Sequence, residues 1–197
     1  TTAGNITVEL GTGTYRGNIY GAGNKGTAGG DVLVSLTGGS VFGAEGKQSG
    51  ITIGGSAGAA VEGNRTLELK GTFGDGDFQN VTFTRFDEIN IAQEGSSATI
   101  WALTDSPSLT KTGAGTLALG YAGNTLAHLT VEEGTLAFTG GATIGVNPNN
   151  ATIVRVSEGA SLALSGGTVN LHAQLNGAGT VTIGTADTAG LVNISNT

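Results

Sequence analysis

The sequence of 197 residues contains no cysteine and no methionine, and it has only 2 prolines and 1 tryptophan. Without cysteine there is no disulfide framework, no thiolate metal site and no thiol nucleophile. This composition also suits a chain that crosses a cell envelope unfolded. The 8 Lys and Arg residues are scattered singly and leave a net charge of -7. Nucleic acids and anionic membrane surfaces require clustered cations, so we expect neither as a partner.

Long apolar runs are missing as well. A membrane helix needs about 20 consecutive apolar residues, and no run approaches this length. The chain also does not begin with the basic and apolar regions of a signal peptide. We therefore expect no membrane insertion by this segment.

Glycine is abundant, with 37 residues. Because proline is scarce, this glycine indicates turns rather than collagen or a proline-rich linker. A hydrophobic content of 38% with only 5% aromatic residues predicts a narrow core of Val, Ile, Leu and Ala. Such a core suits a stack of thin rungs better than a thick sandwich.

Short strands separated by glycine recur along the chain. In the clearest stretch, Leu117 and Leu119 alternate with small or polar residues, and Leu136 and Phe138 repeat the arrangement. Less regular copies of these two segments occur further along the chain, so the pattern is an internal repeat. Repetition of this kind builds a solenoid.

The residues of this repeat resemble a known family. The chain has a Leu-x-Lys-x-Gly-x-Gly-x-Leu-x-Leu opening from Leu109, an Asn124-Thr125 pair, and a Val-x-x-Gly-Thr-Leu closing from Val131. This combination resembles the passenger-associated strand repeat of bacterial autotransporters. The resemblance implies a parallel β-helix displayed outside the cell, at the bacterial surface. It also implies attachment to the outer membrane through a translocator that is not in this chain.

Alternation of apolar and polar residues predicts strands in the rest of the chain too. The apolar sides of these strands are Ile6, Val8 and Leu10; Val32, Val34 and Leu36; Ile51 and Ile53; Leu67 and Leu69; Val81 and Phe83; Ile89 and Ile91; Val154 and Val156; and Val169, Leu171, Ala173 and Leu175. Around residue 101 the pattern allows two solutions. Either Trp101 and Leu103 or Ile100 and Ala102 form the buried pair.

These observations predict the fold class. No segment keeps a helical period for more than a turn or two, so parallel strands can be covered only by other strands. We expect an all-β chain that forms a single-stranded, right-handed parallel β-helix. With about 20 to 25 residues per turn, it makes about eight rungs and a rod about 40 Å long. An antiparallel sandwich is the alternative, but it needs hairpin turns of the Asn-Gly or Asp-Gly type, which are nearly absent.

The domain organisation follows from the repeats. We expect residues 1–197 to form one continuous solenoid. An internal seam at 104–108 is expected to separate a glycine-rich half, 1–104, from a half with the autotransporter repeat, 105–197.

Two glycine-rich motifs imitate known catalytic or cofactor sites. Gly54-Gly-Ser56-Ala-Gly58 fits the nucleophile-elbow pattern around Ser56, and Gly21-Ala-Gly23-Asn-Lys-Gly26 fits the dinucleotide fingerprint. Each motif should open a helix, and no helix is expected. We interpret both as glycine turns.

The densest group of charges consists of Asp75, Asp77, Arg85, Asp87 and Glu88. If these side chains project from adjacent rungs, they could bind calcium or perform acid/base chemistry on a sugar. The spacing fits neither an EF-hand nor a calcium-binding nonapeptide repeat, so a solvated loop is the simpler interpretation.

His128 and His172 lie at predicted outward positions, far apart in sequence and without a nearby acidic residue. We interpret them as structural residues. Accordingly, we assign no catalytic, cofactor-binding or metal-binding residue and expect no cofactor.

The expected function is that of a non-catalytic, extracellular passenger segment. It would act as an adhesin or a rigid stalk of a secreted or autotransported bacterial protein. Its partner would be a host cell-surface component, a matrix component, a glycan, or a second copy of the chain. The alternative is a carbohydrate-active enzyme, a polysaccharide lyase or hydrolase, because β-helices also carry such activities and fold alone does not decide.

Overall fold

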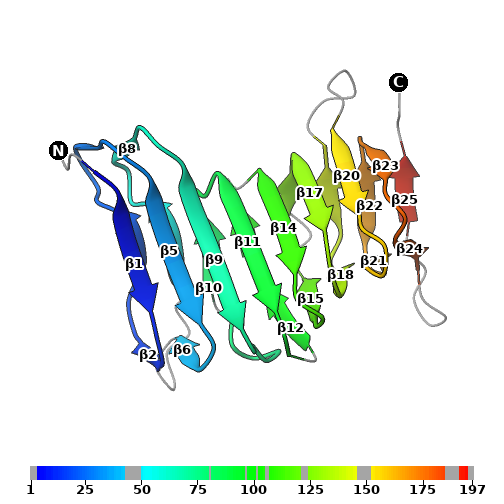
Figure 1. Ribbon diagram of the computed structural model, residues 1–197, viewed down its shortest axis with the longest axis horizontal. Helices are drawn as coiled ribbons and strands as arrows, with labels where there is room; N and C mark the ends of the chain where they lie inside the picture. The colour runs from blue at the N-terminus through cyan, green and yellow to red at the C-terminus, as the bar shows by residue number, and fades with distance from the viewer. Residues whose placement is uncertain are drawn as a thin grey trace.

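The computed structural model describes residues 4–42, 50–79, 81–95, 97–100, 102–104, 107–120, 124–145, 152–184 and 191–194. These residues form an all-β solenoid of about seven turns, in which every strand pairing is parallel. The strands β1 (Ile6–Leu10) and β25 (Leu191–Ile194) lie at opposite ends of the stack (Figure 1). The described residues contain no helix, and therefore none that could cross a membrane. The predicted parallel solenoid is confirmed, and its right-handed sense stays a prediction.

Most turns contribute strands to three faces. The first face is one eight-stranded sheet, formed by β1 (Ile6–Leu10), β5 (Val32–Thr37), β9 (Arg65–Gly71), β11 (Glu88–Gln93), β14 (Ser108–Thr112), β17 (His128–Val131), β20 (Ile153–Val156) and β23 (Gln174–Asn176). The second face begins with the pair β2 (Gly13–Tyr15) and β6 (Ser40–Phe42). It continues as a five-stranded sheet of β12 (Ser97–Ile100), β15 (Thr116–Leu119), β18 (Thr135–Phe138), β21 (Ser161–Leu164) and β24 (Thr180–Ile183).

The third face consists of two four-stranded sheets. The first contains β3 (Ile19–Ala22), β7 (Ile51–Ser56), β10 (Val81–Thr84) and β13 (Ala102–Thr104), and the second contains β16 (Thr125–Leu126), β19 (Ala142–Ile144), β22 (Thr168–Leu171) and β25 (Leu191–Ile194). The short strands β4 (Thr27–Ala28) and β8 (Ala60–Val61) pair with each other near the N-terminal end.

The pairing register of the eight-stranded sheet shows how long each turn is. Ile6 pairs with Val32, and Val32 pairs with Arg65. Further along, Leu109 pairs with Leu129, which is a shorter step along the chain. The predicted turn length therefore holds for the later turns. The first two turns are longer because they also contain the extra strands β4 and β8.

The core follows the predicted alternation. Leu117, Leu136 and Leu162 occupy the same register position on three successive turns and are at most 1% exposed. Large apolar side chains therefore stack on one another along the axis, while the residues between them face outward. The predicted apolar sides of β5, β7, β9, β10, β11, β20 and β22 are likewise buried.

One prediction of facing was wrong at residues 100–103. Ile100 and Leu103 are both buried, at 1% exposure each, whereas the sequence pattern placed them on opposite sides. The reason is a corner: β12 ends at Ile100, and β13 begins at Ala102 on a different face of the solenoid. The alternation of inward and outward residues does not continue across a corner between two strands. Trp101 itself lies outside the described residues.

Leu175 faces inward as predicted but is not buried. It pairs in register with the buried Val154, so it lies on the inward side as expected. However, it is 45% exposed, because β23 is the edge strand of its sheet. Inward orientation buries a side chain only when a further turn covers it.

The N-terminal part of the core is aromatic. Tyr15 stacks on Phe42 with ring centroids 5.6 Å apart, and Phe42 stacks on Phe78 at 6.1 Å. Phe73 and Phe83 contact Phe78 at 5.0 and 5.5 Å. These rings fill the early turns in the way that leucine fills the later ones.

The eight-stranded sheet is continuous across the expected seam at 104–108, because Ile89 on β11, before the seam, pairs with Leu109 on β14, after it. On the third face, by contrast, β13 and β16 belong to separate sheets. There the buried Asn124 accepts a hydrogen bond through its Oδ1 from the Leu103 amide at 3.2 Å. Residues 105 and 106 lie outside the described residues.

Candidate functional site

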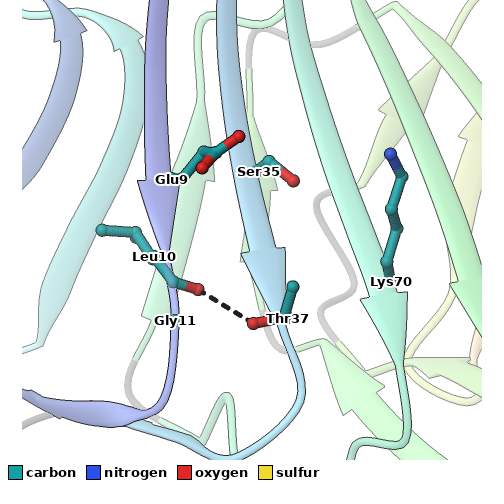
Figure 2. A pocket seen from close by; sticks show the side chains of 6 residues that line it. All are labelled: Glu9, Leu10, Gly11, Ser35, Thr37 and Lys70. Atoms are coloured by element: carbon teal, nitrogen blue, oxygen red, sulfur yellow. Dashed lines mark hydrogen bonds between the residues drawn. The ribbon is translucent and has the colours of Figure 1, made fainter.

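A groove of about 470 Å³ lies on the outward face of the eight-stranded sheet, near its N-terminal end. It is lined by Glu9, Leu10, Gly11, Ser35, Thr37 and Lys70. Figure 2 shows that these residues come from β1 and Gly11 directly after it on one side, from β5 as the floor, and from β9 on the other side. Short hydroxyl side chains therefore lie between two longer charged ones.

The strand register explains this arrangement. Glu9 pairs with Ser35, and Ser35 pairs with Glu68, so these three residues form one outward row across β1, β5 and β9. Thr37 pairs with Lys70 in the next outward row. Because β5 carries only short side chains at these positions, the sheet is hollowed between its neighbours.

Two contacts order the groove. The Lys70 Nζ lies 2.5 Å from Glu68 Oε2, although the side chains are 59% and 25% exposed. An exposed ion pair of this kind contributes at most about 1 kcal/mol. The Thr37 hydroxyl donates a hydrogen bond to the Leu10 carbonyl oxygen at 3.4 Å. The groove is therefore open and polar, and its walls are partly fixed.

The acidic group predicted around residues 75–88 does not converge. Asp75 and Asp77 lie in the segment after the end of β9, whereas Asp87 bonds to Arg65, the first residue of β9. The length of β9 separates the two places by roughly 20 Å. Within the described residues, no three histidine or acidic side chains come close enough to hold a metal ion.

Asp87 instead forms an ion pair with Arg65. Its carboxylate accepts hydrogen bonds from the Arg65 amide and Nε, each at 2.8 Å, and from the Arg65 guanidinium Nη2 at 2.5 Å. The side-chain hydrogen bond from Arg65 is the main cause that lowers the pKa of Asp87 below its usual value. Glu88 follows on the outward face of β11, in register with Thr66.

The other two carboxylates fix the segment between β9 and β10. Asp75 accepts a hydrogen bond from the Ser97 hydroxyl at 2.6 Å, and Asp77 accepts one from the Gly74 amide at 2.8 Å. Phe73 anchors the same segment, because the side chain of the buried Gln93 bonds to both its amide and its carbonyl oxygen. These carboxylates hold a connection in place.

Neither glycine-rich motif forms the site that it imitates. Ser56 is 1% exposed, and its hydroxyl donates to the Ala59 carbonyl oxygen at 2.8 Å. Gly54 to Ser56 belong to β7, so the turn begins only at Ala57. The cavity beside Gly23 measures about 170 Å³, which is smaller than the roughly 300 Å³ of an ordinary small-molecule pocket.

The histidines lie where the sequence placed them. His128 is exposed at the start of β17, and His172 is half-buried just after β22. The two residues come from different faces of the solenoid. They do not combine into a site.

Lys111 is the residue that sequence reasoning overlooked. It is fully buried, and its ammonium donates to the carbonyl oxygens of Thr112 and Gly113, both at 2.6 Å, and of Glu133 at 3.3 Å. These acceptors belong to two successive turns, so the ammonium ties one corner to the next. The signal was available in the sequence, because Lys111 lies two residues after the inward-facing Leu109 on the same strand.

The burial of Lys111 predicts a pH dependence of stability. Desolvation is the largest cause that lowers its pKa, to about 8, while the charges of Glu133 and Glu94 oppose this shift. Between about pH 8 and the ordinary value of 10.5, the folded chain has lost this proton but the unfolded chain keeps it. Stability should therefore rise with pH across this window, by up to about 3 kcal/mol.

Denaturant unfolding at several pH values between about 8 and 10.5 measures this effect. The variant Lys111→Met keeps most of the apolar stem and removes the charge, so it should not show the rise. An equal rise in both proteins would assign the effect to other groups and contradict the prediction.

Comparisons with known proteins add no identification. The chain matches no family model, no curated protein and no solved structure. Functional inference therefore depends on the solenoid, its outward faces and the residues of the repeat.

Proposed function

We propose that this chain is an extracellular segment of a secreted or surface-attached bacterial protein, working as a rigid stalk that presents a binding face. The proposal includes the autotransporter passenger class and a location at the cell surface. It rests on the repeat that begins at Leu109 and on the parallel solenoid in which this repeat lies. In this proposal the chain binds its partner without catalysis.

One observation carries the proposal. The eight-stranded sheet runs along the whole solenoid and is supported from inside by a continuous apolar core. Its outward side bears mostly hydroxyl, amide and charged side chains, and it is hollowed at the groove. Such a surface is held in a fixed geometry, which suits the repeated weak contacts of adhesion.

Blocking the groove tests the binding role. The purified chain would be applied to immobilised glycans and matrix proteins, together with Ser35→Arg, which fills the floor of the groove. The matched control is Ser161→Arg on β21, another half-buried outward serine, on a different face. We expect Ser35→Arg to lose binding and Ser161→Arg to retain it. Absence of binding by the unchanged chain, or equal binding by all three proteins, would contradict the adhesin role.

A polysaccharide-cleaving enzyme is the second candidate. What favours it is that two carboxylates, Glu9 and Glu68, flank Ser35 in one row of the same sheet. Incubation with uronate polysaccharides, scored for new unsaturated or reducing ends, separates the two proposals. If the unchanged chain produces new ends and the Glu68→Gln variant does not, the chain is an enzyme and the stalk proposal is wrong.

A further inference from the structure

The outward carboxylates of the eight-stranded sheet gather in its N-terminal half. They are Glu9 on β1, Glu68 on β9 and Glu88 on β11. Lys70 lies among them, but its ammonium contacts Glu68. With a net charge of -7 on the chain, this region attracts cations rather than anions.

Among the described residues that line the groove, Glu9 supplies the carboxylate that is available to a ligand. It is exposed on the wall of the groove, and it forms no hydrogen bond or ion pair with the described residues. In Figure 2 its side chain extends from β1 towards β5, above the floor of the groove. A ligand ammonium placed there would form a charge-assisted hydrogen bond.

The floor and the far wall add groups that suit hydroxyls. The Ser35 hydroxyl can both donate and accept, and the Lys70 ammonium donates. Among the described residues that line the groove there is no aromatic ring, so the recognition proposed here uses hydrogen bonds and charge rather than stacking. A polyhydroxylated ligand matches this set better than an apolar one.

The spacing of the strands favours a saccharide over a peptide. Neighbouring strands lie about 4.8 Å apart, so the row Glu9, Ser35 and Glu68 offers polar groups at that interval along the rod. A pyranose ring is longer than one residue of an extended peptide, which repeats at about 3.3 Å, so a linked saccharide matches the strand spacing more closely than a peptide does. Successive sugars can therefore meet successive strands.

We propose that the groove between β1 and β9 binds a cationic amino sugar of the glucosamine class, as part of a glycan that lies along the rod axis. The ammonium contacts Glu9, and the ring hydroxyls contact Ser35 and Lys70. This inference rests on the proposed binding role and names the class of its partner.

The test compares three probes on the full chain by calorimetric titration at about pH 6, where amines and carboxylates are both charged. The probes are the glucosamine trisaccharide, the N-acetylglucosamine trisaccharide and trilysine. We expect the glucosamine trisaccharide to bind at least about tenfold more tightly than either of the others, and its binding to weaken with added salt.

Two variants with the same change in charge complete the test. Glu9→Gln should weaken binding of the glucosamine trisaccharide about tenfold, whereas Glu158→Gln, exposed in the turn after β20, should change it less than about twofold. Thermal melts of both variants check that the fold is retained. Equal binding of the acetylated sugar, equal binding of trilysine, an unaffected Glu9→Gln or the absence of any binding would each overturn the inference. If the chain binds other glycans in the immobilised set while the glucosamine trisaccharide does not bind, the adhesin role stands and the amino-sugar assignment fails.

Discussion

Replacing Leu117 by aspartate is expected to destabilise the chain by about 5 kcal/mol, an amount comparable to the whole stability of many domains. Leu117 is 1% exposed and lies between Ala98 and Leu136 in the stack. The substitution removes buried apolar surface and places a carboxylate where no described side chain pairs with it. The site is closed to solvent, so the charge would lose its hydration. Leu171→Asp, also at a site 1% exposed, should have the same effect.

Two outward positions provide the controls. Ala118 is next to Leu117 on β15 but faces outward, in register with Thr99 and Ala137. Gln174 is exposed on β23. Ala118→Asp and Gln174→Asp should each change stability by less than about 1 kcal/mol. Denaturant midpoints of the four variants measure the difference, and similar losses at inward and outward sites would refute the assignment of faces.

The inward-facing side chains of long strands could be predicted from the sequence, because the alternation of inward and outward residues is a local property. Within β15 and β18, alternation identifies Leu117 and Leu136 without knowledge of their partners. The same rule failed at Ile100 and Leu103, since a corner between faces leaves no periodic trace. The sequence therefore predicts the buried side of each strand, whereas it does not predict where the chain turns from one face to the next.

The groove could not be predicted in the same way. Its walls come from Glu9 and Lys70, which belong to strands that become neighbours of β5 only through pairing across two turns of unequal length. Because turn length varies along the chain, neither the partners nor the register follows from the pattern of one strand. Conversely, Asp75 and Asp87 are close in sequence but lie near opposite ends of β9. Proximity along a solenoid chain is a poor guide to proximity in space.

Lys111 shows a different limit. Alternation with Leu109 would have indicated its inward position, but a charged residue is almost never fully buried unless it is paired. What permits its burial is the set of carbonyl oxygens at the corners after β14 and β17. Those acceptors come from two successive turns, so the pairing of Lys111 can be recognised only from the stacked structure and not from the sequence.

Replacing Gly115 by alanine is expected to destabilise the solenoid by about 3 kcal/mol or more, although it adds a single methyl group. Gly115 lies in the corner between β14 and β15, where its amide donates to the Gln93 carbonyl oxygen at 2.8 Å and its own carbonyl oxygen accepts from the Thr135 amide at 3.1 Å. A Cβ atom at this position would overlap with the Gly95 carbonyl oxygen of the preceding turn.

The clash at Gly115 is with backbone, so no side chain can rotate away to relieve it. The corner must move outward, which would lengthen the hydrogen bonds to both neighbouring turns at once. Gly17→Ala is the matched control, because a Cβ there meets nothing within 4 Å. Alanine at position 17 should leave stability unchanged or raise it by less than about 1 kcal/mol through the unfolded state. Denaturant unfolding of the two variants compares the sites directly, and a Gly115→Ala protein as stable as Gly17→Ala would show that the corners are not packed backbone against backbone.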